Sequence, residues 1–354
     1  MKVKHGFLGI LIITLILTST YPGVFLGLEW VWASNTVIST VDVGERPSAL
    51  AFNPSNNNIY VANTNSNDVS VIESSSNTVI STVDVGDGPS ALAFNPSNNN
   101  IYVANALSDD VSVIESSSNT VISTVDVGDG PSALAFNPSN NNIYVANAYS
   151  NNVSVIESSS NTVISTVDVG ERPSALAFNP SNNNIYVANA YSNNVSVIES
   201  SSNTVISTVD VGERPSALAF NPSNNNIYVT NLVSDDVSVI ESSSNTVIST
   251  VDVGDGPSAL AFNPSNNNIY VANAYSNNVS VIESSSNTVI STVDVGDGPS
   301  ALAFNPSNNN IYVTNPVSDD VSVIETTGSK PIVDAISDQS ISIRNLVLSY
   351  GNNM

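Results

Sequence analysis

A stretch of 42 residues, repeated seven times with almost no change, constrains this chain more than any other feature of its sequence. The first copy spans residues 36–77 and reads TVISTVDVGERPSALAFNPSNNNIYVANTNSNDVSVIESSSN. Each later copy begins at an equivalent threonine: Thr78, Thr120, Thr162, Thr204, Thr246 and Thr288. Such regular repeats fold as a series of equal units, so one unit predicts the architecture of the whole array.

Each copy contains four short runs rich in Val, Ile, Tyr, Phe and Thr. In the first copy these runs cover residues 36–43, 48–53, 59–63 and 69–74. They partly alternate between apolar and polar residues and are too short for helices, which indicates strands. The segments between them are rich in Asn, Pro, Gly and Ser, which favour turns. Four antiparallel strands in a unit of this length are typical of a β-propeller blade.

The seven copies therefore predict an all-β fold, a seven-bladed β-propeller with four antiparallel strands in each blade. The array starts with the TVISTVDV strand at residues 36–43 and ends at residues 321–326, with no eighth TVISTVDV. We expect strand 36–43 to pair with strand 321–326, because this pairing closes the ring and removes two exposed edges. An open β-solenoid is the alternative architecture. The near identity of the copies favours the closed ring.

The repeat resembles a known family. The segments Ile227–Asn231 and Ile311–Asn315 read IYVTN, the defining motif of the YVTN β-propeller repeat, and are flanked by VSVI, NTVISTVDVG and PSALAFNP. The other five copies read YVAN, a mild departure from the motif. The resemblance covers about residues 36–327 and implies a seven-bladed propeller of the kind found in archaeal surface-layer and other exported proteins. Its relatives also include cofactor-handling proteins and lactonase-like enzymes, so it implies no single activity.

The two ends of the chain differ from the propeller, which we expect over residues 34–329. Residues 1–33 combine a basic start, an apolar run and a small-residue site at Ala33, as in a signal peptide. If this segment stays uncut, it anchors the chain in the membrane, and either case places the propeller outside the cytoplasm. Residues 330–354 resemble the start of an immunoglobulin-like or PKD-type module, but they are too short to form a core.

Charge excludes one class of partner. The net charge is −24, and the propeller contains only three basic residues, Arg46, Arg172 and Arg214. Binding to nucleic acid needs clustered Lys or Arg beside the phosphates, so we expect no nucleic-acid partner. The chain contains no Cys, which excludes thiolate chemistry.

Catalysis by a Ser–His or Cys–His arrangement is also excluded in the mature chain. The only histidine, His5, lies in the export segment. Two carboxylates could still act as acid and base, but each carboxylate recurs in nearly every blade, whereas an active site is usually asymmetric. We therefore expect no enzyme, no catalytic residues and no cofactor.

The copies differ mainly in two loops, which we expect on the same face of the propeller. One loop precedes the strand that begins at Ser48, and the other follows Asn63. The NPSNNN loop and, up to the last copy, the ESSSN turn do not vary. The divergent face is the predicted binding surface, with drift at exposed loop tips as the alternative. Its candidate interaction residues are Arg46, Arg172, Arg214, Tyr149, Tyr191 and Tyr275.

Three further sets of residues recur. Carboxylate pairs suit Ca²⁺, although capping of turns is the simpler function: Asp109, Asp110, Asp235, Asp236, Asp319 and Asp320. Three sequons could accept glycans in an exported protein: Asn152, Asn194 and Asn278. The seven tyrosines at the Tyr60 position are expected to pack between blades.

The sequence thus favours a non-enzymatic, exported, surface-associated propeller that acts as a structural or adhesive module. Its expected partners are other cell-surface proteins or glycans, and its only expected contact with a membrane is through the N-terminal segment. Two alternatives remain, an extracellular lactonase-like hydrolase and a propeller that carries a ligand or cofactor. The sequence does not indicate an oligomeric state.

Overall fold

The computed structural model of the chain describes residues 9–12, 29–32, 41–305, 308–318 and 320–326. It contains two compact units, Met1–Asp42 and Val43–Met354. In the first unit, β1 (Gly9–Ile12) pairs antiparallel with β2 (Glu29–Trp32). No helix in the described part of the chain is long and apolar enough to cross a membrane. Most of the predicted export segment and all of the tail 330–354 lie outside the described residues.

The second unit is built from seven antiparallel sheets. In the first sheet the strands follow chain order, β3 (Pro47–Asn53), β4 (Asn58–Asn63), β5 (Asp68–Glu73) and β6 (Thr78–Asp84). The same order recurs in the other sheets, of which the seventh has three described strands. Their bounds are β7 (Pro89–Asn95), β8 (Asn100–Asn105), β9 (Asp110–Glu115), β10 (Thr120–Asp126), β11 (Pro131–Asn137), β12 (Asn142–Asn147), β13 (Asn152–Glu157), β14 (Thr162–Asp168), β15 (Pro173–Asn179), β16 (Asn184–Asn189), β17 (Asn194–Glu199), β18 (Thr204–Asp210), β19 (Pro215–Asn221), β20 (Asn226–Asn231), β21 (Asp236–Glu241), β22 (Thr246–Asp252), β23 (Pro257–Asn263), β24 (Asn268–Asn273), β25 (Asn278–Glu283), β26 (Thr288–Asp294), β27 (Ala301–Asn305), β28 (Asn310–Asn315) and β29 (Asp320–Glu325).

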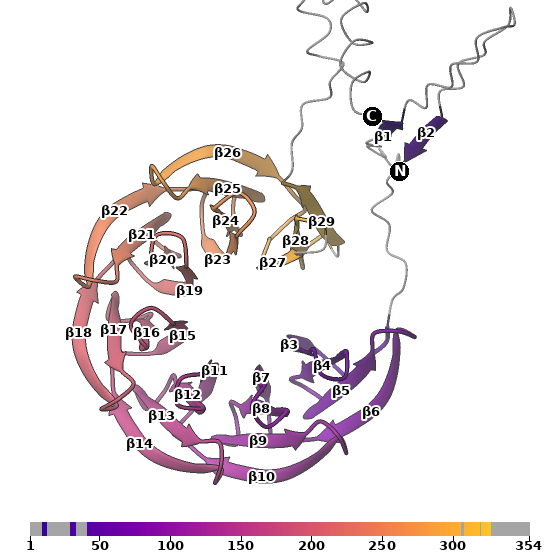
Figure 1. The fold of residues 1–354 in the computed structure, drawn as a ribbon, viewed down its shortest axis with the longest axis vertical. Coiled ribbons are helices and arrows are strands. Elements are labelled where there is room, and N and C mark those ends of the chain that lie inside the picture. Colours follow the sequence, from indigo (N-terminus) through magenta and orange to yellow (C-terminus); the bar gives the residue numbers. More distant parts are fainter. Residues whose placement is uncertain (1–8, 13–28, 33–40, 306–307, 319, 327–354) are drawn as a thin grey trace, which may run out of the picture. The chain divides into compact units, whose positions relative to one another are not determined.

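The sheets are arranged as blades around a central space (Figure 1). The PSALAFN strands, from β3 to β23, lie innermost, and the TVISTVD strands, from β6 to β26, lie outermost. This confirms the predicted seven-bladed β-propeller with four antiparallel strands per blade.

The hydrophobic core lies between blades rather than within them. Tyr60, Val69 and Val71 of the first blade pack against Ile101 and other residues of the second. Equivalent clusters fill the next five interfaces. Since each sheet buries both faces only by stacking on neighbours, no blade is stable alone.

The tyrosines at the Tyr60 position connect neighbouring blades, as the sequence predicts. Tyr60 is fully buried, and its hydroxyl donates to Asn119 Oδ1 of the second blade at 3.0 Å. The same bond joins Tyr144 to Asn203 at 2.9 Å. A buried hydroxyl without a partner would cost stability, so this bond is one reason for Asn at the end of the ESSSN turns from Asn119 to Asn287.

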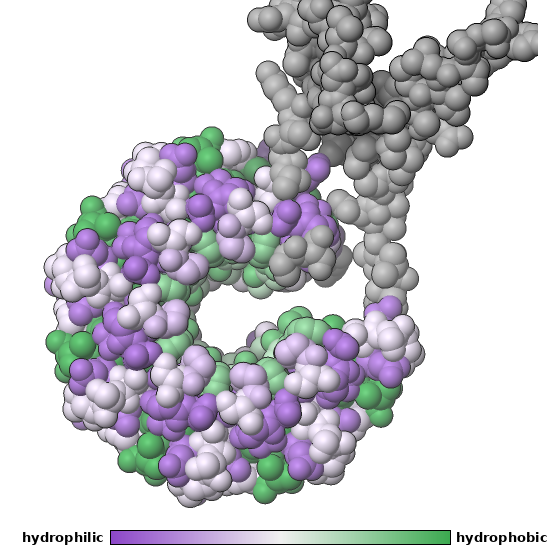
Figure 2. Space-filling view, in the orientation of Figure 1, coloured by the Kyte–Doolittle hydropathy of each residue, from purple (hydrophilic) through white to green (hydrophobic). Residues whose placement is uncertain are grey.

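Two bulges shape each of the first six blades. In the inner strand, Ser48 is the extra residue, and its hydroxyl donates to the carbonyl of Pro89 in the next blade at 3.0 Å. In the outer strand, the extra residue is Ile80, which is 50% exposed. The equivalent isoleucines form the hydrophobic patches spaced along the outer circumference (Figure 2).

The Asn-rich loops reflect a backbone requirement. Three turns in the first blade place Asn57, Asn67 and Asn77 at φ values of 58°, 56° and 51°. Asn tolerates this left-handed conformation better than most residues with a side chain. The same positions carry Asn or Asp in later copies, with Ser329 as the exception, which explains the polar composition of the repeat.

The predicted pairing of residues 36–43 with 321–326 falls partly outside the described residues, which omit 36–40. Residues 41–43 are described and are not part of a strand. In the described part of the chain, β28 is the only strand that pairs with β29. Leu50 of β3 is 69% exposed, whereas its equivalent Leu92 packs against the core of the preceding interface. Closure of the ring stays a prediction.

Paired cysteines test this closure, because the chain has no native Cys. In the first blade Val69 and Val83 are partners across β5 and β6, which makes Val321 and Val41 the equivalent pair. The V41C/V321C variant should form an intramolecular disulfide. The oxidised variant should be more stable by about 3–5 kcal/mol and should therefore melt at a higher temperature. The control V41C/S322C is one residue out of register. Failure of V41C/V321C to form the bond would contradict closure.

Alkaline pH should destabilise the propeller. Burial raises the pKa of Tyr60, Tyr102, Tyr144, Tyr186 and Tyr228 above the ordinary value of 10.0. The unfolded chain therefore loses these protons at lower pH than the folded chain. The contribution of these tyrosines to the free energy of unfolding should thus be constant below about pH 9 and fall above about pH 10.

Urea unfolding between pH 8 and pH 11 at constant ionic strength measures this effect. The Y144F/Y186F variant, which removes two of the titrating groups, should show a shallower decline above pH 10. A decline as steep as that of the unmodified chain would contradict the assignment to buried tyrosines.

Candidate functional site

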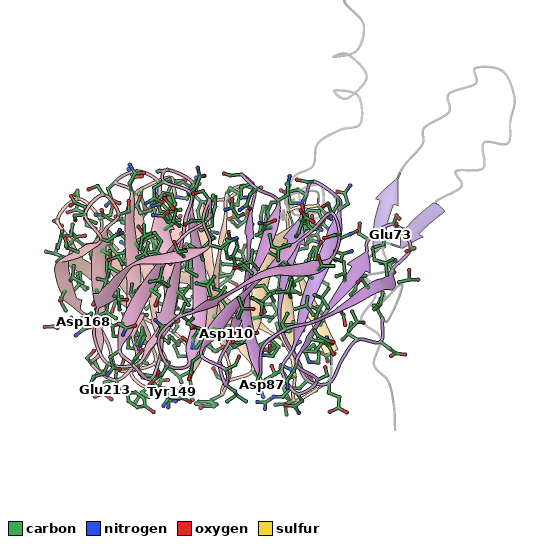
Figure 3. All side chains as sticks on the ribbon, turned by 90° about the horizontal axis from the view of Figure 1, so that it is seen from below. Glu73, Asp87, Asp110, Tyr149, Asp168 and Glu213 are labelled. Atoms are coloured by element: carbon green, nitrogen blue, oxygen red, sulfur yellow. The ribbon has the colours of Figure 1, made fainter. Side chains whose placement is uncertain are left out.

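The two loops that differ between copies lie together on one rim of the propeller, which we call the variable rim. Their backbones are joined directly: the amide of Ala106 donates to the carbonyl of Gly88 at 2.9 Å, and that of Leu107 to Asp87 at 3.0 Å. The second of these bonds is present in all seven blades. Figure 3 shows Asp87, Tyr149 and Glu213 along this rim. The prediction that both loops share one face is confirmed.

The opposite rim explains why NPSNNN and ESSSN do not vary. Ser97 donates to Asn141 Oδ1 of the next blade at 2.6 Å. Asn98 Nδ2 donates to the carbonyl of Ser158 at 3.4 Å. Ser158 lies in the turn before the outermost strand of the next blade. Because these side chains join neighbouring blades, a substitution there weakens an interface, whereas the variable rim is free of this set of contacts.

The variable rim has its own connection between blades, made by fewer side chains. Asn67 Oδ1 accepts from the backbone amide of Gly88 at 2.9 Å. Asp109 and Asp235 make the same contact with Gly130 and Gly256, at 2.8 Å each. These two calcium candidates therefore act as acceptors for the next blade.

The second member of each carboxylate pair begins the third strand of its blade. Asp110 Oδ1 accepts from the buried Asn105 amide at 2.6 Å, and Asp236 and Asp320 accept from equivalent asparagines. Asp319 lies outside the described residues. Within the described part of the chain, no three His, Cys, Asp or Glu side chains gather where they could hold a metal ion. Calcium binding stays a prediction.

Arginine replaces glycine at one turn of the variable rim. Arg46, Arg172 and Arg214 have φ values of 56°, 54° and 58°, and the equivalent glycines in the other four blades have values of 62–67°. A residue with a side chain costs about 1 kcal/mol more than Gly in this conformation. Turn geometry therefore does not explain the arginines, and strained residues of this kind are often functional.

Arg172 lies between two tyrosines. Its guanidinium carbon is 4.8 Å from the ring centre of Tyr191 and 5.5 Å from that of Tyr149. Its Nη1 also donates to the Tyr191 hydroxyl at 2.8 Å. Both rings stay more than half exposed, at 65% for Tyr149 and 55% for Tyr191. The guanidinium is thus held by cation–π contacts between two blades, with part of its hydrogen-bonding capacity unused.

Glycine and arginine determine where the loop tyrosine lies. A Cβ at Gly130 would meet Tyr149 Cδ2 at 2.3 Å, so the Tyr149 ring covers this turn. Tyr275 covers Gly256 in the same way, with a Cβ contact of 2.5 Å. Tyr191 faces an arginine instead and lies beside the guanidinium.

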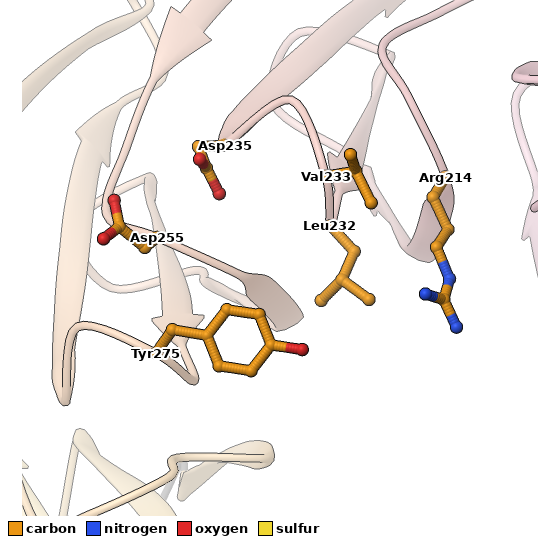
Figure 4. A pocket seen from close by; sticks show the side chains of 6 residues that line it. All are labelled: Arg214, Leu232, Val233, Asp235, Asp255 and Tyr275. Atoms are coloured by element: carbon orange, nitrogen blue, oxygen red, sulfur yellow. The ribbon is translucent and has the colours of Figure 1, made fainter.

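A shallow depression of about 360 Å³ lies between the fifth and sixth blades. Figure 4 shows Tyr275 and Arg214 on either side of Leu232. The carboxylates of Asp235 and Asp255 lie on the side away from Arg214. Its lining combines a cation, an aromatic ring, two aliphatic side chains and two acceptors, and such a mixture is common in ligand sites. The lining residues are Arg214, Leu232, Val233, Asp235, Asp255 and Tyr275.

None of the three arginines forms an ion pair with a described residue, although the protein carries a net charge of −24. Arg172 has the tyrosine contacts above, and Arg46 lacks an aromatic neighbour within the described residues. The cations of the variable rim therefore have no carboxylate partner among the described residues.

The three sequon asparagines are half-buried at the start of β13, β17 and β25. Their side-chain oxygens accept hydrogen bonds from Asn147, Asn189 and Asn273 at 2.7–2.8 Å. Glycosylation of Asn152, Asn194 and Asn278 stays a prediction.

The structure brings together residues that the sequence does not connect. Tyr149 and Arg172 are in different copies and meet because one loop of each blade lies beside the other loop of the next. Leu232, Val233 and Asp255 enter the site only through the depression. The repeat spacing could have indicated the first pairing, but no sequence signal indicates the second.

Comparisons with known proteins support the fold. A family model described as "Lactonase, 7-bladed beta-propeller" matches residues 73–210. Among solved structures, Kuenenia stuttgartiensis hydrazine synthase is similar, with a TM-score of 0.67 and 19% sequence identity over 83% of this chain and 99% of that chain. No curated protein sequence matches this chain. The chain is thus similar to a β-propeller family, and the structural likeness at this identity shows the shared fold alone.

Substitution of the rim arginines by glycine distinguishes the cost of the left-handed backbone from the stabilisation by cation–π contacts. R214G should raise the free energy of unfolding by about 1 kcal/mol, because it relieves left-handed backbone and removes no ring contact. R172G gains the same relief but loses two cation–π contacts of about 0.5–1 kcal/mol each, so we expect no net gain. Urea unfolding measures both variants. An equal gain in both would show that the tyrosines do not hold Arg172.

Proposed function

We propose that the chain is an exported, surface-associated YVTN-type propeller that binds a cell-surface partner through its variable rim and catalyses no reaction. One observation carries this proposal: arginines occupy strained turn positions on the same rim where the copies diverge. Glycine fits the same turn in four blades, and within the described residues only Arg172 of the three contacts an aromatic ring of a neighbouring blade. Exposed tyrosine and arginine side chains are enriched where proteins bind partners.

A lactonase-like hydrolase is the second candidate, because the family model for such propellers matches residues 73–210. Hydrolysis of a lactone needs a group that activates water and a group that stabilises the developing charge. The buried tyrosines whose pKa values are raised lie between blades, hydrogen-bonded to the neighbouring turns, where they act structurally. The rim arginines and tyrosines serve binding in our proposal, and hydrolysis would need other groups.

Binding to isolated envelopes of the source organism tests the proposal. The variant Y149S/Y191S/Y275S changes the variable rim, and the control P96S/P138S/P180S changes exposed prolines of the opposite rim. We expect at least tenfold weaker binding for the first variant, since exposed aromatic anchors often dominate binding energy, and no change for the control.

Two results would contradict the proposal. One is equal envelope binding by both variants and the unmodified chain. The other is hydrolysis of five- or six-membered lactones by the purified chain, followed by acid release at constant pH, which would favour the hydrolase.

A further inference from the structure

Five aromatic and cationic residues of the variable rim follow one another over four consecutive blades, the third to the sixth. We call Tyr149, Arg172, Tyr191, Arg214 and Tyr275 the Tyr–Arg arc. Arg172 contacts Tyr149 of the third blade and Tyr191 of its own. The backbone amide of Arg214 donates to Asn193, two residues after Tyr191, at 2.9 Å. Arg214 and Tyr275 then line the same depression.

The arc presents two kinds of recognition group in alternation. The tyrosine rings are flat, 55–73% exposed, and offer faces on which the C–H groups of a sugar ring can pack. The guanidinium groups present planar pairs of N–H donors that match a carboxylate. Asp235 and Asp255 supply acceptors for hydroxyl groups beside them.

The arginines have the same position in successive blades, the fourth and the fifth. A ligand that contacts both must therefore carry at least two acidic groups. A polymer with one carboxylate on each unit or on alternate units meets this requirement. The flat rings between the cations fit the sugar units of a polysaccharide.

Other polyanions fit the rim less well. A nucleic acid would bring dense phosphate charge to a protein with a net charge of −24. An extended acidic peptide would gain most by pairing with a strand edge, but the strands of the described blades end at this rim in turns. The depression offers only Leu232 and Val233 as aliphatic contacts for a peptide side chain.

We propose that the Tyr–Arg arc binds a linear polysaccharide of the uronic-acid class, with the carboxylates on Arg172 and Arg214 and the sugar rings on the tyrosines. This inference deepens the proposed function and depends on the variable rim being a binding surface. It adds the chemical class of the ligand and the two arginines that bind its carboxylates.

Calorimetry with the purified full chain tests the proposal, using oligomers of mannuronic acid and the same oligomers after reduction of their carboxyl groups. The variant R172G/R214G keeps the turn, because four blades carry glycine at this position. The matched control R46G removes the one rim arginine outside the arc. We expect binding of the acidic oligomers, at least tenfold weaker binding after carboxyl reduction, and the same loss in R172G/R214G but not in R46G.

Three outcomes would overturn the inference. Equal binding of the reduced oligomers would show that the carboxylates do not contribute to binding. Binding of poly-glutamate as tight as that of the uronic oligomers would indicate an acidic peptide as ligand. No binding of any acidic oligomer, with envelope binding still lost in Y149S/Y191S/Y275S, would refute the ligand class and leave the proposed function intact. Absence of envelope binding altogether would refute the proposed function itself.

Discussion

The structure depends on one contact repeated between blades, the buried tyrosine whose hydroxyl reaches the turn of the next blade. Tyr144, for example, fills the interface with its ring and donates to Asn203 at 2.9 Å. The ring supplies apolar burial and the hydroxyl fixes the rotation of one blade against the next. Asn140 of the NPSNNN loop also donates to the Tyr144 hydroxyl, at 3.3 Å, so substitution of the asparagines that bond to this tyrosine should reduce stability. On the variable rim, fewer side chains make contacts between blades.

This asymmetry separates stability from recognition within a single repeat. On the variable rim, neighbouring blades are joined mainly through one acceptor, Asn or Asp, as at Asn67 and Asp109. The residues around that acceptor can change while its hydrogen bond to the backbone amide of the next blade is kept. Arginine at a left-handed turn is the clearest instance, because Gly fits the same turn in four blades and costs less. The turn conformation alone therefore does not account for such a residue.

Much of the fold could be predicted from the sequence, because the repeat fixes strand number, turn positions and the packing role of the Tyr60 position. The site was predicted only in part. Arg172 and Tyr149 could be named as rim residues, but their contact depends on how far one blade is rotated against the next. Leu232 and Asp255 could not be identified, since a repeat pattern does not show which small differences create a depression. Closure of the ring falls on residues 36–40, outside the described chain.

A repeated fold also limits what kind of site it can build. An active site needs different groups at one place, whereas near-identical blades offer the same groups at equal spacing. The Tyr–Arg arc follows this constraint, since it uses Arg at one turn position in the fourth and fifth blades and Tyr at one loop position in the third, fourth and sixth. A surface made in this way suits a ligand that is itself repetitive, because each added blade contacts one more unit of it. Under the proposed binding of an acidic polymer, the net charge of −24 should disfavour ligands of denser negative charge.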